Sequence, residues 1–112
     1  MPRMFDRSVQ SSGLKTIAAG TTDGAIVSAV PEQRIRVIGF WANSVSTSTF
    51  VFNTKPSGAG TAISPIVTPA AAQNTNISNG GTTLFQTNIG EGLTLTTGAG
   101  GNTGVVVSYV VA

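Results

Sequence analysis

The chain has 112 residues and a formal net charge of +2, and 40% of its residues are hydrophobic but only 9% are charged. This length provides about one domain with one modest core. Cysteine and histidine are both absent, which excludes disulfide bonds, cysteine and Ser-His-Asp catalysis and the usual zinc sites.

Residues 1–12 (MPRMFDRSVQSS) are expected to form a short N-terminal arm ahead of a domain over residues 13–112. The arm lacks the apolar stretch of a signal peptide, and no apolar run approaches the roughly 20 residues of a membrane span. We therefore expect a soluble protein made inside a cell, with no membrane partner.

The domain begins with two predicted strands. Residues 14–18 predict a short edge strand, and residues 21–24 predict a turn because Asp and Gly tolerate a positive φ angle. Residues 25–30 predict a strand that ends at Pro31, since proline cannot donate a hydrogen bond to a neighbouring strand.

The longest predicted strand covers residues 33–45 (QRIRVIGFWANSV). In its first part Ile35 and Val37 share one face, whereas Arg34 and Arg36 share the other. Its second part is apolar on both faces, which predicts that the strand passes from a half-exposed surface into the core.

A glycine lies at the centre of that strand, at position 39, and predicts a bulge or bend there. Trp41, which follows it, and Tyr109 near the end of the chain are both flanked by apolar residues. We expect both aromatic side chains in the core.

In the middle of the chain, segments that clearly predict a strand or a loop are followed by one with a weak secondary-structure pattern. Residues 48–53 predict a strand with Phe50 and Phe52 on one face, and residues 55–60 predict a loop. Residues 61–79 predict short strands or irregular coil, because two prolines interrupt them.

The C-terminal part contains three predicted strands, over residues 82–87, 92–97 and 104–111. The loop over residues 98–103 is rich in glycine and predicts a hairpin between the last two strands. The closing strand is apolar on both faces, which is typical of a central strand or a subunit contact.

Seven to nine short strands separated by turn residues predict an all-β fold, a single jelly-roll-like β-sandwich. A simpler Greek-key sandwich accommodates the same segments, so the strand order stays open.

The acidic residues do not form a catalytic or metal-binding motif. There are four of them: Asp6, Asp23, Glu32 and Glu91. They lie in the arm or in predicted loops without paired spacing, so we expect no enzyme, no small-molecule substrate and no cofactor. Asp23 or Glu91 with loop carbonyls remains a calcium alternative, but the EF-hand spacing is absent and solvated charge is the preferred interpretation.

The basic residues are scattered: Arg3, Arg7, Lys15, Arg34, Arg36 and Lys55. A nucleic-acid partner is not expected, because phosphate binding requires clustered Lys and Arg. The shortage of charge predicts association with further copies or with a larger assembly, although a Thr-rich strand face is also simply good β chemistry. Arg34 and Arg36 form either a small basic patch for carboxylates or a solvated strand face.

Residues 31–112 resemble the small jelly-roll decoration (cement) or head-associated accessory proteins of tailed bacteriophages. The resemblance rests on the segments IRVIGFWANSVSTSTFVFN, GEGLTLTTGAGG and VVVSYVV, on the Gly/Ser/Thr-rich middle and on the near-absence of Cys, His and charge. It implies a structural protein of the virion, a homotrimer that binds the major capsid protein on the outside of the head and stabilises the shell.

The resemblance carries over no catalytic residue. Under it, the residues expected to touch the capsid are Arg3, Phe5 and Arg7 of the arm, together with Arg34 and Arg36. Two alternatives stay open. One is another minor virion component, and the other is a carbohydrate-binding module or phage fibre tip, which would need Trp41 or Tyr109 exposed beside Asn or Asp.

Overall fold

The computed structural model describes residues 9–44, 48–68, 74–78 and 80–112 of the chain. These residues form ten strands and no helix, and hence no helix that could cross a membrane. The strands are β1 (Gln10–Ser11), β2 (Lys15–Ile17), β3 (Gly24–Val27), β4 (Ile35–Ser44), β5 (Phe50–Lys55), β6 (Thr61–Ala62), β7 (Asn74–Ser78), β8 (Phe85–Gln86), β9 (Gly92–Thr97) and β10 (Thr103–Val111).

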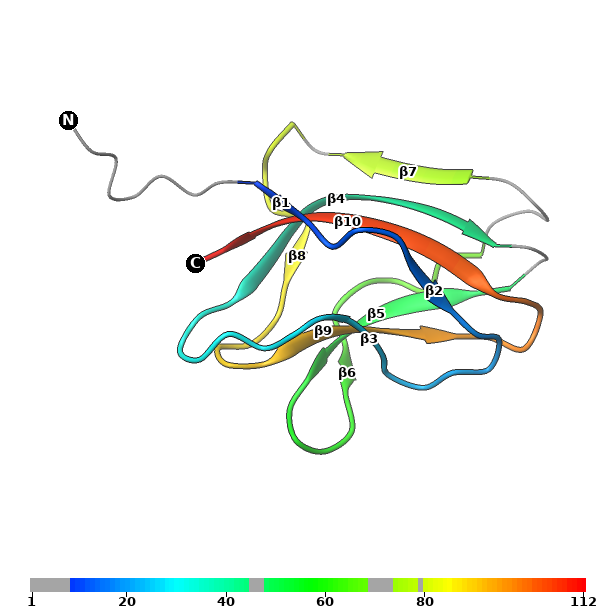
Figure 1. The fold of residues 1–112 in the computed structure, drawn as a ribbon, viewed down its shortest axis with the longest axis horizontal. Coiled ribbons are helices and arrows are strands. Elements are labelled where there is room, and N and C mark those ends of the chain that lie inside the picture. The colour runs from blue at the N-terminus through cyan, green and yellow to red at the C-terminus, as the bar shows by residue number, and fades with distance from the viewer. Residues whose placement is uncertain (1–8, 45–47, 69–73, 79) are drawn as a thin grey trace.

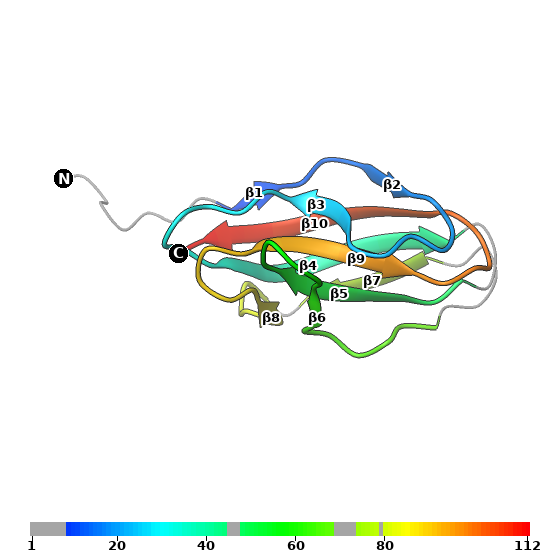
Figure 2. The ribbon, with the colours of Figure 1, turned by 90° about the horizontal axis from the view of Figure 1, so that it is seen from below.

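The strands form two antiparallel sheets that pack face to face. Sheet A has the order β1-β10-β4-β7, with β2 also paired to β10 and β8 to β4, and sheet B has the order β3-β9-β5-β6. Figure 1 views the two layers from one edge, and Figure 2 looks onto sheet B with sheet A behind it. The predicted all-β sandwich is confirmed.

The order of the strands is that of a jelly roll. With β1 and β2 taken as one strand, and β7 and β8 as another, the described residues contain eight strands. The first lies beside the last in sheet A, and the second lies beside the seventh in sheet B. This settles the choice that the sequence left open in favour of the jelly roll.

The predicted hairpin between the last two strands is wrong. β9 pairs with β3 and β5 in sheet B, whereas β10 pairs with β1, β2 and β4 in sheet A. Their loop therefore carries the chain from one sheet to the other. The physical reason is the core: Leu93 and Val105 are both fully buried, and the crossover lets the two strands face each other across it.

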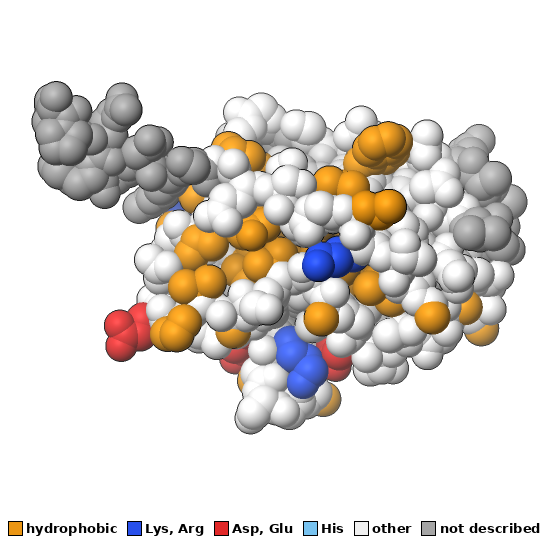
Figure 3. Space-filling view, viewed as in Figure 1, with side chains coloured by type: hydrophobic (Ala, Val, Ile, Leu, Met, Phe, Trp, Pro, Cys, Tyr) orange, Lys and Arg blue, Asp and Glu red, His pale blue; other side chains and the backbone are white. Residues whose placement is uncertain are grey.

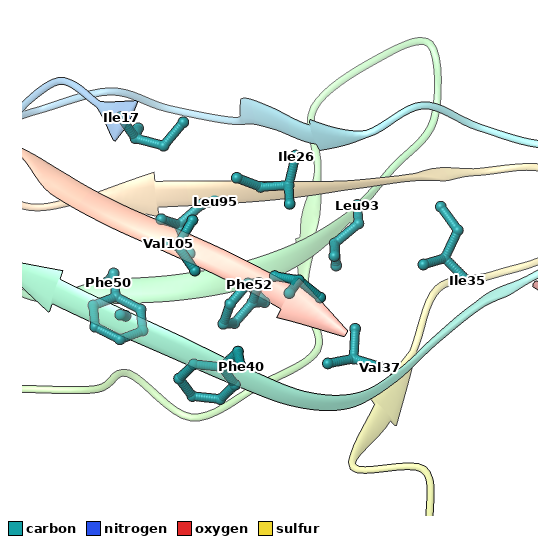
Figure 4. Close-up of a cluster of buried hydrophobic side chains, with 12 residues drawn as sticks. Ile17, Ile26, Ile35, Val37, Phe40, Phe50, Phe52, Leu93, Leu95 and Val105 are labelled. Atoms are coloured by element: carbon teal, nitrogen blue, oxygen red, sulfur yellow. The ribbon is translucent and has the colours of Figure 1, made fainter. Parts of the chain in front are cut away.

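The core lies between the sheets and is centred on phenylalanines. Phe52 has no exposed surface, and its ring centroid lies 5.0 Å from that of Phe40 and 5.1 Å from that of Phe85. Phe50 meets both Phe40 and Phe52 edge to face. Figure 4 shows Phe50 and Phe52 of β5 beside Phe40 of β4, so the predicted shared face of Phe50 and Phe52 is confirmed.

The predicted bend in β4 is confirmed as a β-bulge. Ser108 pairs with Gly39 and Tyr109 with Val37, which leaves Ile38 as an extra residue of β4. A Cβ atom at position 39 would lie 3.0 Å from the Ile77 carbonyl oxygen, so the residue must be small for β7 to approach.

The bulge changes which residues of β4 face the core. Before it Ile35 and Val37 are buried, and after it Phe40, Ala42 and Ser44 are buried. Trp41 therefore points away from the core and is 54% exposed. The prediction that Trp41 belongs to the core is wrong, because the extra residue reverses the alternation of the two faces.

Two predicted strands are shorter than expected. β3 ends at Val27, before the proline at position 31, and β8 consists of two residues. Both lie at the edges of the sandwich, where a strand has a neighbour on one side only. The other edge strand expected from the sequence, over residues 14–18, is confirmed as β2.

Candidate functional site

The outer face of sheet A carries an aromatic side chain among amides. Trp41 pairs directly with Val106 of β10 and with Asn76 of β7. Two pairs further along, Asn43 lies opposite Asn74, and its Nδ2 donates a hydrogen bond to Asn74 Oδ1 over 2.7 Å. Neighbouring strands are about 4.8 Å apart, so these amides flank the indole.

Two hollows lie on either side of Trp41. The larger has a volume of about 370 Å³, and its lining includes Gly39, Trp41, Asn76, Ser78, Val106 and Ser108. The smaller has a volume of about 120 Å³ and is lined by Leu14, Trp41, Asn43, Gly104, Val105 and Val106. Gly39 and Gly81 line the larger hollow and Gly104 lines the smaller one, and neither is lined by a charged residue from the described part of the chain.

The condition set for a glycan-binding surface is thus met by Trp41, which is exposed beside asparagines. Tyr109 is different: it is partly buried, packs against the core and donates a hydrogen bond to Gln10 Oε1 over 3.2 Å. Its predicted place in the core is therefore confirmed in part.

The sequence did contain a signal for the exposure of Trp41. Once the bulge is recognised, the two-residue period of a strand places Trp41 and Asn43 on the outer face and Phe40, Ala42 and Ser44 on the inner face.

The arginines predicted to contact a partner lie at one end of the sandwich. Arg36 pairs with Val110 of β10, and the Arg34 backbone N–H donates to the Ala112 carbonyl over 2.7 Å. At the same end Gln10 of β1 pairs with Tyr109, so β1 lies on one side of β10 and β4 on the other (Figure 1).

Both arginine side chains are half-buried, and neither guanidinium group donates a hydrogen bond to another described residue. The Nε of Arg36 is buried without a partner in the described part of the chain. Of the other predicted contacts, Arg3, Phe5 and Arg7 lie outside the described residues. Of the five predicted contact residues, the structure therefore describes two, Arg34 and Arg36, and both lie at the same end of the sandwich.

A third hollow opens at the edge of the sandwich between β1, β2 and β3. It has a volume of about 590 Å³, and its lining includes Gln10, Lys15, Ile26, Val30, Gln33 and Tyr109. Figure 3 views this edge, where hydrophobic side chains gather to the left of a Lys or Arg side chain near the centre of the view. Two serines, Ser11 and Ser12, also line the hollow.

Two acidic side chains in loops accept hydrogen bonds from other parts of the chain. Asp23 accepts hydrogen bonds from Thr94 Oγ1 over 2.9 Å and from the Gly60 backbone N–H over 3.0 Å. Glu91 accepts one from Thr54 Oγ1 over 2.7 Å. Both residues lie in loops, as the sequence predicted, and the structure adds that these partly buried carboxylates connect the loops to sheet B.

The remaining carboxylates are those of Glu32 and Asp6. Glu32 is exposed, in the left-handed conformation with φ of 63°, and Asp6 lies outside the described residues. Within the described ranges, no three Asp, Glu, His or Cys side chains are grouped as metal ligands.

We predict that Asp23→Ala lowers the free energy of unfolding by about 2–4 kcal/mol, because it leaves the Gly60 N–H and the Thr94 hydroxyl without their acceptor. It also places alanine at a φ of 55°, a conformation that alanine adopts reluctantly. Urea unfolding measures the loss. Asp23→Asn is the matched control: asparagine tolerates this conformation and retains one oxygen acceptor, so it should lose less. An alanine variant as stable as the wild type would contradict the prediction.

Comparison with known proteins identifies no family. No protein-family model matches the chain, and the search of curated proteins finds no significant match.

Proposed function

We propose that this chain is a non-catalytic structural protein of a virion, which decorates the outside of a tailed-phage head and stabilises it. The observation that carries the proposal is the end of the sandwich where β1, Arg34 and Arg36 lie, with β10 between β1 and β4. There the N-terminal arm leaves the sheet beside two cations whose guanidinium groups donate no hydrogen bond to another described residue, as a small binder needs to attach to a larger assembly at one point.

The rest of the described surface supports the same proposal. Charged residues make up 9% of the chain, and the outer faces of both sheets present mainly Thr, Ser, Asn and Val. Such a surface has little charge to keep copies apart. A trimer presents the attachment end three times, so weak single contacts with the major capsid protein add up to stable occupancy of the shell.

The two arginines make the proposal specific. Guanidinium groups bind carboxylates with paired hydrogen bonds, so an acidic patch on the capsid surface is the expected partner. The buried Nε of Arg36 has no hydrogen-bond partner among the described residues, and a buried donor without an acceptor costs stability. An acceptor supplied by the capsid, or a rearrangement of the side chain on binding, would remove that cost.

The test is co-sedimentation with heads of the encoding phage that were prepared without this protein. The double variant Arg34→Ala/Arg36→Ala should bind at least about tenfold more weakly than the wild type. The control Lys15→Ala/Lys55→Ala removes the same charge at other positions and should bind nearly normally. Equal binding by both double variants would overturn the role of the arginines, and absence of wild-type binding would overturn the capsid proposal.

Light scattering tests the oligomer in the same preparation. We expect three times the chain mass of 11.3 kDa. We also expect the protein to remain a trimer when residues 1–8 are deleted. That deletion spares β1, which is part of sheet A. A monomer in both forms would contradict the trimer.

A further inference from the structure

We propose that the outer face of sheet A is a binding site for a neutral glycan. In this site a sugar ring stacks on Trp41 within the hollow that contains Gly39, and side-chain amides and hydroxyls bind the sugar hydroxyls. The proposal does not depend on attachment to a capsid. Because Val9 and Ile38 also line the hollow, the site borders the end of the sandwich that carries β1 and Arg36.

The exposure of Trp41 is the first argument. It is the only tryptophan in the chain and is 54% exposed in the middle of a ten-residue strand. Its neighbours Phe40 and Ala42 are buried, so the strand itself is firmly held. A tryptophan side chain presents a large, rigid, flat apolar surface with one N–H donor. Held on a sheet, that surface is a preformed platform for another flat apolar face.

The shape of the surface is the second argument. The larger hollow, of about 370 Å³, lies within the range of small-ligand sites, about 300–1,000 Å³. Gly39 has no side chain to fill it, and its position is the bulge that turns Trp41 outward. The same local irregularity therefore creates both the platform and the space beside it.

The polar groups are the third argument. Asn76, Ser78 and Ser108 line the larger hollow, and their side chains make no hydrogen bond to another residue of the described chain. At the smaller hollow, Asn43 uses one N–H on Asn74, and its side-chain carbonyl oxygen and second N–H make no hydrogen bond to another described residue. Amides and hydroxyls both donate and accept, as the hydroxyl groups of a sugar do.

Charge decides which sugars fit. Among the described residues no Asp, Glu, Lys or Arg lines either hollow, so none of them compensates the carboxylate of an acidic sugar or a phosphate group. A neutral ring loses no ionic hydration on entering and is the favoured ligand.

A second copy of the chain is the competing occupant. The centres of protein–protein contacts are depleted in serine, whereas ligand hollows combine apolar walls with a few placed polar groups. The larger hollow beside Trp41 combines apolar walls, which include Val9, Ile38, Ile77 and Val106, with two serines and an asparagine, and this corresponds to the second pattern.

The test uses the fluorescence of the single tryptophan. The full chain is titrated with neutral oligosaccharides of glucose, mannose, galactose and N-acetylglucosamine, and we expect saturable change in Trp41 emission with at least one of them. Calorimetry with that sugar should show affinity at least about tenfold lower for Trp41→Ala and a partial loss for Asn76→Ala, while Trp41→Phe keeps part of the affinity. The control Ile66→Ala removes another exposed apolar side chain, 70% exposed, and should bind normally.

Two results would overturn the proposal. One is that none of the four sugar classes changes the emission or gives heat of binding. In that case a fall in light-scattering mass for Trp41→Ala would identify the face as a contact between copies. The other is a sugar that binds Trp41→Ala as tightly as the wild type. Head binding by Trp41→Ala, measured in parallel, keeps failure of this proposal distinct from failure of the capsid proposal.

Discussion

Replacing Phe52 with alanine is expected to lower the free energy of unfolding by about 3–5 kcal/mol. Phe52 is completely buried at the centre of the sandwich, and three other phenylalanine rings have centroids within 6.1 Å of its own. Truncation removes the apolar contacts and leaves a cavity between two sheets, which cannot close without moving whole strands.

Urea unfolding followed by circular dichroism measures this effect. Domains of this size are stable by about 5–15 kcal/mol, so the variant would keep only part of the native stability. Ile66→Ala is the control, because Ile66 is 70% exposed and its truncation should change stability by no more than about 0.5 kcal/mol. Equal stability of the two variants would contradict the assignment of Phe52 to the centre of the core.

Deletion of Ile38 is expected to abolish most of the stability of the fold. Ile38 is the extra residue of the β4 bulge, and its removal shifts one half of the strand by one position relative to the other. Either Trp41 and Asn43 then turn into the core, or Arg36 does. Burial of an amide or a guanidinium group without partners costs several kcal/mol, and buried side chains such as Phe40 would turn to water.

Ile38→Ala is the matched control, since it removes the side chain and keeps the bulge. Ile38 is half-buried, so we expect a loss below about 2 kcal/mol for the substitution. The two variants are compared by urea unfolding and by the Trp41 emission. A deletion variant as stable as the substitution variant, with Trp41 still exposed to water, would show that the bulge does not determine which face Trp41 occupies.

The strands with the strongest local signals were predicted most accurately. β9 has the predicted bounds, and β10 begins one residue earlier than expected. β9 alternates leucine with threonine between two glycine-containing loops, and β10 is rich in valine and follows the second of these loops. Both patterns depend only on neighbours in the chain. Segments with weaker local patterns, such as β8, are much shorter than predicted, because the adjacent strand decides how many residues pair.

The candidate sites show the same division. The sequence identified Arg34 and Arg36 as neighbours on one strand face, and the structure adds that β1 lies at the same end. The Trp41 surface was missed as an exposed site, because the flanking apolar residues predict burial. Asn76, which completes it, is 35 residues further along the chain and reaches Trp41 only through the pairing of β7 with β4.

By itself, the sequence determined that this protein is an all-β chain without cysteine or histidine chemistry, and it located the bend at Gly39 and the shared face of Phe50 and Phe52. These follow from composition, the two-residue period of a strand and the conformational freedom of glycine, all of which are local properties. Only the tertiary structure decided that β9 and β10 belong to different sheets and that Trp41 faces solvent. Both depend on packing between residues distant in the chain: the burial of Leu93 against the opposite sheet and the close approach of Ile77 to Gly39.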